Sequence, residues 1–96
     1  MTKADLVADI SEKTGVEKIA VQATVESFMQ SIIDTMENGE NVYLRGFGSF
    51  VIKKRAEKTG RNISKNIAVK IPAQNIPSFK PAKIFMRGVK SKMPIS

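Results

Sequence analysis

The stretch from Lys53 to Pro72 constrains this chain more than any other. It carries seven Lys or Arg residues and a single acid, Glu57, and it contains no aromatic residue. Its outgoing half, Ile67–Ile71, alternates apolar residues with small or basic ones, and turn-forming residues separate it from the incoming half. This pattern predicts a long basic β-ribbon that leaves the body of the protein. Because such a ribbon buries too little surface to offset the conformational entropy lost on ordering, we expect a polyanion to order it.

The net charge of +7 is placed unevenly along the 96 residues. Residues 1–40 hold three Lys and eight Asp or Glu, a local net charge of −5, whereas residues 41–96 hold thirteen Lys or Arg and one acid, a local net charge of +12. The asymmetry predicts an acidic scaffold and a basic end that binds nucleic acid or another polyanion. The alternative interpretation, a charged surface that only keeps the protein soluble, fits poorly with so few acids in the second part.

The length of the chain limits its core. We expect a single domain, residues 1–96, in which only about three quarters of the chain builds the core. Disulfides and His or Cys metal sites are excluded because the chain has no cysteine and no histidine. Oligomerisation is the remaining common source of stability, so the sequence predicts an obligate dimer.

Several classes of function are disfavoured by what the sequence lacks. No base–nucleophile pair stands out at any spacing, so we do not expect an enzyme, a cofactor, a metal or a small-molecule substrate. Neither a membrane-spanning apolar run nor a signal peptide is present, so we expect a cytoplasmic protein without a membrane partner.

Two helices are expected before the basic part. Thr2 and Asp5 fit a capping box for a first helix over roughly 3–14, and Gly15 is suited to its C-terminal end. A second helix over about 17–38 carries a broad apolar stripe at helical spacing. The breadth of the stripe predicts packing against more than one neighbour, as at a dimer seam.

Shorter elements follow. We expect a strand at 41–44, a return strand at 74–79 that its prolines confine to an edge or to irregular pairing, and a last helix from Ala82 to about Lys90. The tail, residues 91–96, is expected to fray.

The run Arg45–Phe50 reads RGFGSF. Its two glycines allow positive φ angles and a tight reversal, but they are too few for a loop that cradles a nucleotide phosphate. We interpret Phe47 and Phe50 as core or interface anchors. The alternative, base stacking, usually exposes several aromatic residues on one sheet.

Three motifs carry a resemblance to a known family: RGFGSF at Arg45–Phe50, RAEKTGRN at Arg55–Asn62 and IPSFKP at Ile76–Pro81. With these motifs in the expected order and spacing, the chain resembles the bacterial histone-like HU and integration host factor family from about Thr2 to Lys90. The resemblance implies an α+β fold and an intertwined dimer. A helical pair forms the base, an antiparallel sheet forms a saddle, a β-ribbon arm at about 53–72 protrudes, and a short helix ends the chain.

The resemblance also implies a function. The arms of such a dimer wrap double-stranded DNA in the minor groove, and the protein bends or compacts the duplex in the bacterial nucleoid with low sequence specificity. We expect a homodimer, with a heterodimer as the alternative. Two alternatives are a sequence-specific DNA-bending subunit of the integration host factor type and an RNA-binding module, and a purely structural oligomer would bind no nucleic acid.

The tip of the arm is where the chain departs from the family. Arg61 and Asn62 are the expected minor-groove contacts, and the family carries a proline directly after them that wedges between base pairs. Here that position is Ile63, which can serve as an apolar wedge but lacks the fixed backbone of proline.

Contacts between cationic side chains and phosphates should supply most of the affinity through counterion release. For Lys3, at the start of the first helix, a phosphate contact and simple solvation are equally open. The expected phosphate-binding residues are Lys3, Lys53, Arg55, Lys58, Lys70, Lys80, Lys83 and Arg87, with Arg45 as a further candidate. Lys65 is also expected to contact DNA.

Overall fold

A computed structural model describes residues 1–62 and 67–95, with side chains described outside 61–70. Three helices and five strands follow one another in these described residues, and the predicted α+β class is confirmed. In order they are α1 (Lys3–Thr14), α2 (Lys18–Glu37), β1 (Val42–Leu44), β2 (Gly48–Arg55), β3 (Lys58–Asn62), β4 (Ile67–Ile71), β5 (Gln74–Pro81) and α3 (Lys83–Lys92).

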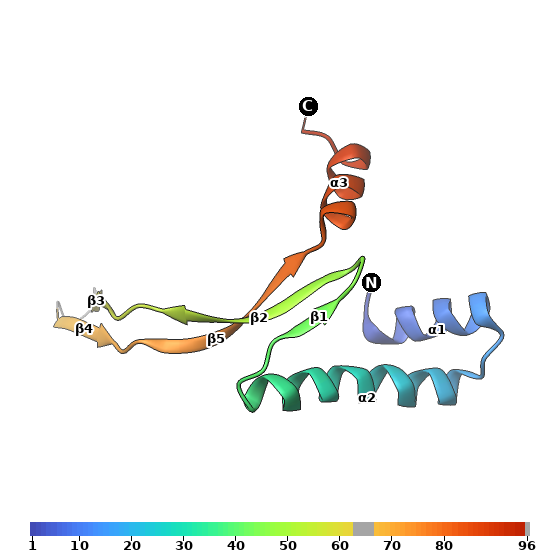
Figure 1. Ribbon diagram of the computed structural model, residues 1–96, viewed down its shortest axis with the longest axis horizontal. Helices are drawn as coiled ribbons and strands as arrows, with labels where there is room; N and C mark the ends of the chain where they lie inside the picture. Colours follow the sequence, from blue (N-terminus) through green and yellow to red (C-terminus); the bar gives the residue numbers. More distant parts are fainter. Residues whose placement is uncertain (63–66, 96) are drawn as a thin grey trace.

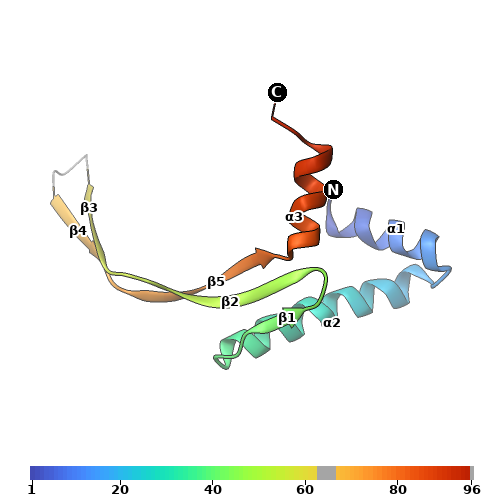
Figure 2. The same cartoon turned by 45° about the horizontal axis from the view of Figure 1, so that its top comes forward.

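The strands form two antiparallel sheets. In the described chain, β1, β2 and β5 make a three-stranded sheet in the order β1-β2-β5, and β3 pairs with β4 in a two-stranded one. The first sheet lies over α2, and the second extends from it as an arm (Figures 1 and 2). The expected ribbon therefore leaves the body, and the predicted position of the return strand at a sheet edge is also confirmed.

Local chemistry sets the ends of α1. The Thr2 N–H donates to Asp5 Oδ2 over 2.9 Å, and the Asp5 N–H donates to Thr2 Oγ1 over 3.3 Å, which completes the predicted capping box. At the other end Gly15 has a φ of 75° and its N–H donates to the carbonyl of Ser11. Only glycine adopts that left-handed geometry without strain, so α1 ends where the sequence predicts.

The two glycines between β1 and β2 serve different purposes. Gly46 has a φ of 81° and makes the reversal, as expected. Gly48 has no positive φ, and the expectation of two permissive turn glycines is wrong in its case. A Cβ at Gly48 would lie 2.6 Å from the Phe79 ring and from the carbonyl oxygen of Lys80. Gly48 is required because β5 and the phenylalanine approach too closely for any side chain.

The ribbon is interrupted where it leaves the body. β2 and β5 pair as far as Arg55 and Gln74, and the ladder begins again with β3 and β4 after a gap of two residues on each side. Pro72 lies in this gap and has no N–H to donate, so it cannot take part in a continuous ladder. The predicted single ribbon over 53–72 is thus two ladders in series. The predicted turn and the wedge position fall on residues 63–66, outside the described residues.

The C-terminal part differs slightly from expectation. Pro81 still belongs to β5, α3 begins at Lys83, and it continues to Lys92 instead of fraying after residue 90. The Phe85 ring stacks on Phe47 with ring centroids 5.6 Å apart, which attaches α3 to the turn between β1 and β2. The turn phenylalanine is thus part of an aromatic cluster, in agreement with its interpretation as an anchor.

The chain buries little of its own apolar surface. Among the described residues only Val7 and Val21 form a buried hydrophobic core. An open cavity of about 1160 Å³ lies between the helices and the sheet, lined by apolar side chains that include Phe28, Ile33 and Phe50. The radius of gyration is 18.9 Å, whereas a compact domain of this length has about 13 Å.

Candidate nucleic-acid interface

Alternation along β2 separates apolar side chains from cationic ones. Phe50 and Ile52 line the large cavity, and both are partly buried. Because successive side chains of a strand point to opposite faces, Lys53 and Arg55 belong to the other face, and both are exposed. The strand therefore has an apolar side toward the cavity and a cationic side at the base of the arm.

The predicted phosphate-binding residues are spread over helices, strands and the turn between β1 and β2, and all those with described side chains are exposed. Within the described residues, no ion pair to an acid engages any of them except Lys3. Such cations keep their full charge available for an external anion. They are Arg45 in the turn between β1 and β2, Lys53 and Arg55 on β2, Lys58 on β3, Lys80 on β5, and Lys83 and Arg87 on α3.

The predicted tip residues are only partly within the described chain. Arg61 and Asn62 are the last residues of β3, opposite Ala68 and Ile67 of β4, and Lys70 also lies on β4. Their side chains are outside the described part. The predicted contacts Ile63 and Lys65 lie outside the described residues.

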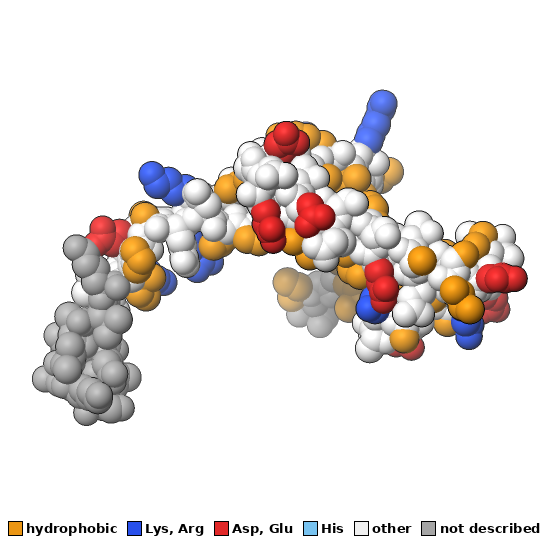
Figure 3. Space-filling model, turned by 90° about the horizontal axis from the view of Figure 1, so that it is seen from below, with side chains coloured by type: hydrophobic (Ala, Val, Ile, Leu, Met, Phe, Trp, Pro, Cys, Tyr) orange, Lys and Arg blue, Asp and Glu red, His pale blue; other side chains and the backbone are white. Residues whose placement is uncertain are grey.

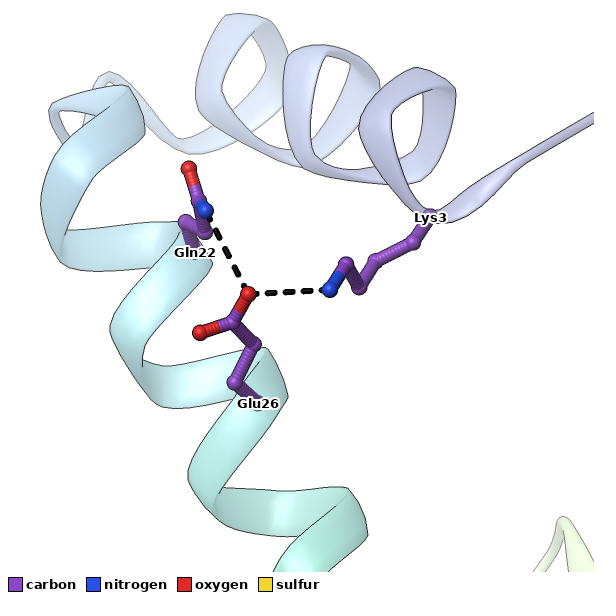
Figure 4. Close-up of polar contacts among 3 residues, drawn as sticks. All are labelled: Lys3, Gln22 and Glu26. Atoms are coloured by element: carbon purple, nitrogen blue, oxygen red, sulfur yellow. Dashed lines mark hydrogen bonds and ion pairs between the residues drawn. The ribbon is translucent and has the colours of Figure 1, made fainter.

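Lys3 is held by an acid that the sequence did not single out. Its Nζ lies 2.9 Å from Glu26 Oε1, and Gln22 Nε2 donates to the same oxygen over 3.3 Å (Figure 4). The Lys3 hydrogen bond, followed by that of Gln22 and the lysine charge, lowers the pKa of the Glu26 carboxyl. The two roles expected for Lys3, a phosphate contact and simple solvation, did not include a partner within the chain. No local spacing could reveal a pair 23 residues apart on two helices.

The β2–β5 register brings together cations that are distant in sequence. Arg45 and Lys80 both line a concavity of about 340 Å³ at the body end of the sheet, together with Tyr43. Tyr43 was not among the predicted site residues. Alternation with the partly buried Val42 and Leu44 places it on the outer face, and this was the available signal.

Charge is also distributed unevenly in space. In the face shown in Figure 3, Asp and Glu side chains gather over the helical part, and Lys and Arg side chains stand along the strands that lead to the arm. The described residues contain no group of three or more acidic side chains that could hold a metal ion. The charge distribution therefore favours a polyanion at the sheet and the arm, and disfavours one at α1 and α2.

Comparison with known proteins identifies the family. A family model described as bacterial DNA-binding protein matches residues 1–90. The chain belongs to the HU family of bacterial DNA-binding proteins. The HU family resemblance of the sequence motifs is thereby confirmed, and a family of DNA-binding proteins agrees with the expectation that the chain is not an enzyme.

Individual HU proteins are similar over almost their full length. The prophage-derived DNA-binding protein HU 2 of Bacillus subtilis is 39% identical over 92 residues, which cover 96% of this chain and 100% of the relative. The DNA-binding protein HU of Thermus thermophilus is 39% identical over 90 residues, covering 94% and 93%.

Solved HU structures share the fold. An HU–DNA cocrystal structure from Anabaena matches with a TM-score of 0.87 at 34% identity, covering 99% of this chain and 100% of that one. An HU variant from Thermotoga maritima matches with a TM-score of 0.72 at 27% identity, covering 94% and 100%.

None of the helices in the described part of this HU-family chain is long and apolar enough to cross a membrane.

The Lys3–Glu26 pair leads to a test by pH. The pKa of Glu26 is lower in the folded chain than its ordinary value of 4.5. The carboxylate therefore stabilises the fold above its unfolded pKa, and this contribution is lost as the pH falls through the lower folded pKa. We expect Glu26→Gln to unfold at a slightly lower temperature than wild type at neutral pH, because an exposed pair contributes little. The two melting temperatures should converge as the pH falls below 4.5.

Asp5 provides an internal control in this experiment. Its pKa is also lowered, first by the backbone hydrogen bond from Thr2 and then by the side-chain one, and it titrates in both proteins. Its effect on the melting temperature therefore cancels in the comparison. A difference that persists or widens at acid pH would contradict the role of the Glu26 carboxylate.

Proposed function

We propose that this chain is an architectural DNA-binding protein. As a dimer of single-domain subunits, it binds duplex DNA with low sequence specificity and bends or compacts it in the nucleoid, in the bacterial cytoplasm. The observation that carries the proposal is the exposed cationic face of β2, with Lys53 and Arg55, at the base of a two-stranded arm in a chain of the HU family. The relatives described above carry the HU name, which favours the low-specificity reading over a site-specific bender.

Phosphates supply most of the binding free energy in this proposal. Each Lys or Arg that neutralises a phosphate releases a condensed counterion, and the affinity falls steeply as the salt concentration rises. Phosphate contacts position the protein without reading the sequence. The proposed contacts are Arg45, Lys53, Arg55, Lys58, Lys65, Lys70, Lys80, Lys83 and Arg87, with Lys3 contributing once its bond to Glu26 is broken.

The arm tip is proposed to enter the minor groove. Arg61 and Asn62 contact the groove edges, whose hydrogen-bonding pattern is degenerate, so the sequence preference is low. Ile63 is proposed as the apolar wedge between base pairs. Unstacking costs a few kcal/mol, which the additional contacts to a bent duplex offset.

A second copy of the chain is proposed to fill the large cavity. Phe28, Met29 and Ile33 on α2 remain 48%, 40% and 47% exposed, although they line an apolar cavity. A solitary domain that leaves such side chains in water forgoes about 1.5–3 kcal/mol for each one that it could bury. A partner helix with the same stripe has matching chemistry.

The accessible area supports a partner of this size. The chain exposes 8337 Å², whereas the scaling for folded monomers gives roughly 5,500 Å² at this mass. The excess is shared between the protruding arm and the apolar surface of the body, and obligate dimers bury about 2,000 Å² or more in total. The cavity is thus better suited to a subunit than to a small molecule.

Lys53 and Lys54 offer a matched test of the phosphate mechanism. The two neighbours carry the same charge, but alternation places Lys53 on the cationic face and Lys54 on the side of Ile52. We expect Lys53→Ala to weaken duplex binding about three- to tenfold and to lower the slope of log affinity against log salt by roughly one for each lysine in contact. Lys54→Ala should change both quantities much less. Fluorescence anisotropy titrations at several salt concentrations measure them.

The outcome for the wild-type protein decides the mechanism. A flat salt dependence would exclude phosphate-dominated binding. Equal losses in the two lysine variants would show that net charge matters and the cationic face does not.

The dimer can be tested at α2. Ile33→Glu places a carboxylate in the apolar cavity, where burial of an unpaired charge is costly. We expect this variant to lose the dimer and to unfold at much lower temperature, whereas Gln30→Glu, an exposed position on the same helix, should remain dimeric. Sedimentation equilibrium measures the association. A stable, folded wild-type monomer at micromolar concentration would exclude the proposed dimer.

The wedge can be tested by bending. We expect Ile63→Ala to reduce the bend of a duplex labelled at both ends, because alanine presents too little apolar surface to hold a base step open. Ile63→Pro should keep or increase the bend, since its fixed φ holds the tip in place. Energy transfer between the end labels reports the bend. Unchanged transfer in the alanine variant would remove Ile63 from the mechanism.

A further inference from the structure

β1 lies beside only the body end of β2. The register pairs Val42 with Phe50 and Leu44 with Gly48, whereas β2 continues to Arg55 with β5 along its other edge. In the described sheet, which has the order β1-β2-β5, the edge of β2 that faces β1 therefore has no neighbouring strand after Phe50. Residues 51–55 of β2 form the base of the arm, and Figure 1 shows β2 continuing beyond β1 toward the arm.

The end of α2 prevents β1 from extending along β2. Continuation of the register would place Glu40 opposite Ile52. The Glu40 N–H, however, donates to the carbonyl of Thr35 over 3.2 Å, and Gly39 turns the chain away from the helix with a φ of 86°. Because a backbone N–H that closes the helix cannot also donate across the sheet, the ladder stops at Val42.

A side chain takes the place of the missing backbone partner. The backbone N–H of Ile52 donates to Asn41 Oδ1 over 2.9 Å. Asn41 Nδ2 donates to the hydroxyl oxygen of Tyr43 over 3.2 Å, so the amide is held at both ends and its oxygen has to face Ile52. Asn41 immediately precedes β1 and is exposed, so its effect comes from joining β2 to the body at the base of the arm and does not come from burial.

We propose that Asn41 is a positioning residue that sets the direction in which the arm leaves the body. A ribbon of two strands twists and bends more readily than a wider sheet. β5 holds one edge of β2 at this point, and the bond from Ile52 to Asn41 ties the other edge to the segment that joins α2 to β1. The residue acts through the backbone of Ile52 and needs no contact with DNA. The inference rests on the proposed function, because the direction of the arm determines how far a duplex bends when the arm holds it.

A pair of spin labels measures the direction of the arm without DNA. The chain contains no cysteine, so Thr59→Cys on β3 and Gln30→Cys on α2 give two unique labelling sites. Labelled chains are diluted with unlabelled ones, so that each measured distance joins two labels of one chain. We expect Asn41→Ala to broaden the distribution of distances between the labels, because the base of the arm is then held along one edge only.

Two further variants serve as controls for the label distances. Asn41→Asp keeps an oxygen that accepts from the Ile52 N–H, and it should restore the narrow wild-type distribution. Asn38→Ala removes another exposed asparagine, for which the described chain shows only backbone hydrogen bonds, and it should leave the distribution unchanged. A broad distribution in either control, or the wild-type distribution in Asn41→Ala, would exclude the proposed role.

Amide hydrogen exchange reports on the bond itself. The Ile52 amide should exchange about fivefold faster in Asn41→Ala than in wild type, the factor expected for the loss of one ordinary hydrogen bond. Exchange at the wild-type rate in this variant would show that the bond does not hold β2 in solution, and would also exclude the role of Asn41.

The consequence for DNA is a separate measurement. On a duplex labelled at both ends and saturated with protein, Asn41→Ala should lower the mean energy transfer. The slope of log affinity against log salt should keep its wild-type value, because no cation is lost. Unchanged energy transfer in Asn41→Ala would exclude the link between the direction of the arm and bending. If wild type does not bind duplex, the proposed function fails, whereas the label distances in the free protein still decide the role of Asn41.

Discussion

The two-residue alternation along β2 determines which parts of the molecule can lie against each face of the sheet. Phe50 and Ile52 require cover on one face, and α2 lies on that side. Lys53 and Arg55 are exposed at the arm end of the other face, where water or an anion can solvate their charges. A shift of the register by one residue would exchange the two faces and bury the cations. Gly48 pins this register, because only a residue without a side chain allows β5 to lie so close.

A chain this short cannot cover the whole apolar face of such a strand. The helices cover the apolar side only in part, and a large cavity remains between α2 and the sheet. In the proposed dimer, a second copy brings the same apolar stripe and the same cationic face, so that it closes the cavity and doubles the charge. The apolar face of β2 thus contributes to stability, and its cationic face contributes to polyanion binding. The two functions use different residues of the strand.

Local patterns predicted the features that depend on neighbouring residues. The Thr2–Asp5 capping box and the left-handed Gly15 set the ends of α1, and each can be recognised from a few neighbouring residues in the sequence. The arm could also be predicted locally, because its residues form a continuous basic stretch that contains no aromatic residue. The HU motifs then supplied the order of elements between these landmarks.

Features that depend on strand register or on tertiary packing could not be predicted from the sequence. The role of Gly48 follows from the distance to Phe79, which only the β2–β5 pairing sets. The Lys3–Glu26 pair joins two helices, and its distance in sequence hides it. The interruption at Pro72 needed both strands to be aligned before the gap could be seen. The concavity around Tyr43 likewise depends on three strands.

The separation of charge within the chain keeps the arm available for an external partner. A chain with eight acids in its first forty residues could in principle fold its own basic ribbon onto them. Two observations oppose this. Acidic side chains over the helices are partly satisfied by nearby lysines, as in the Lys3–Glu26 and Lys13–Asp9 pairs. The molecule is 57 Å long, whereas charges in physiological salt are screened beyond about 8 Å, so the far end of the arm feels little attraction to the helical scaffold. The same acids repel a duplex that approaches from the helical side. The first two helices therefore do more than support the sheet: they direct the polyanion to the face that carries the exposed cations of β2.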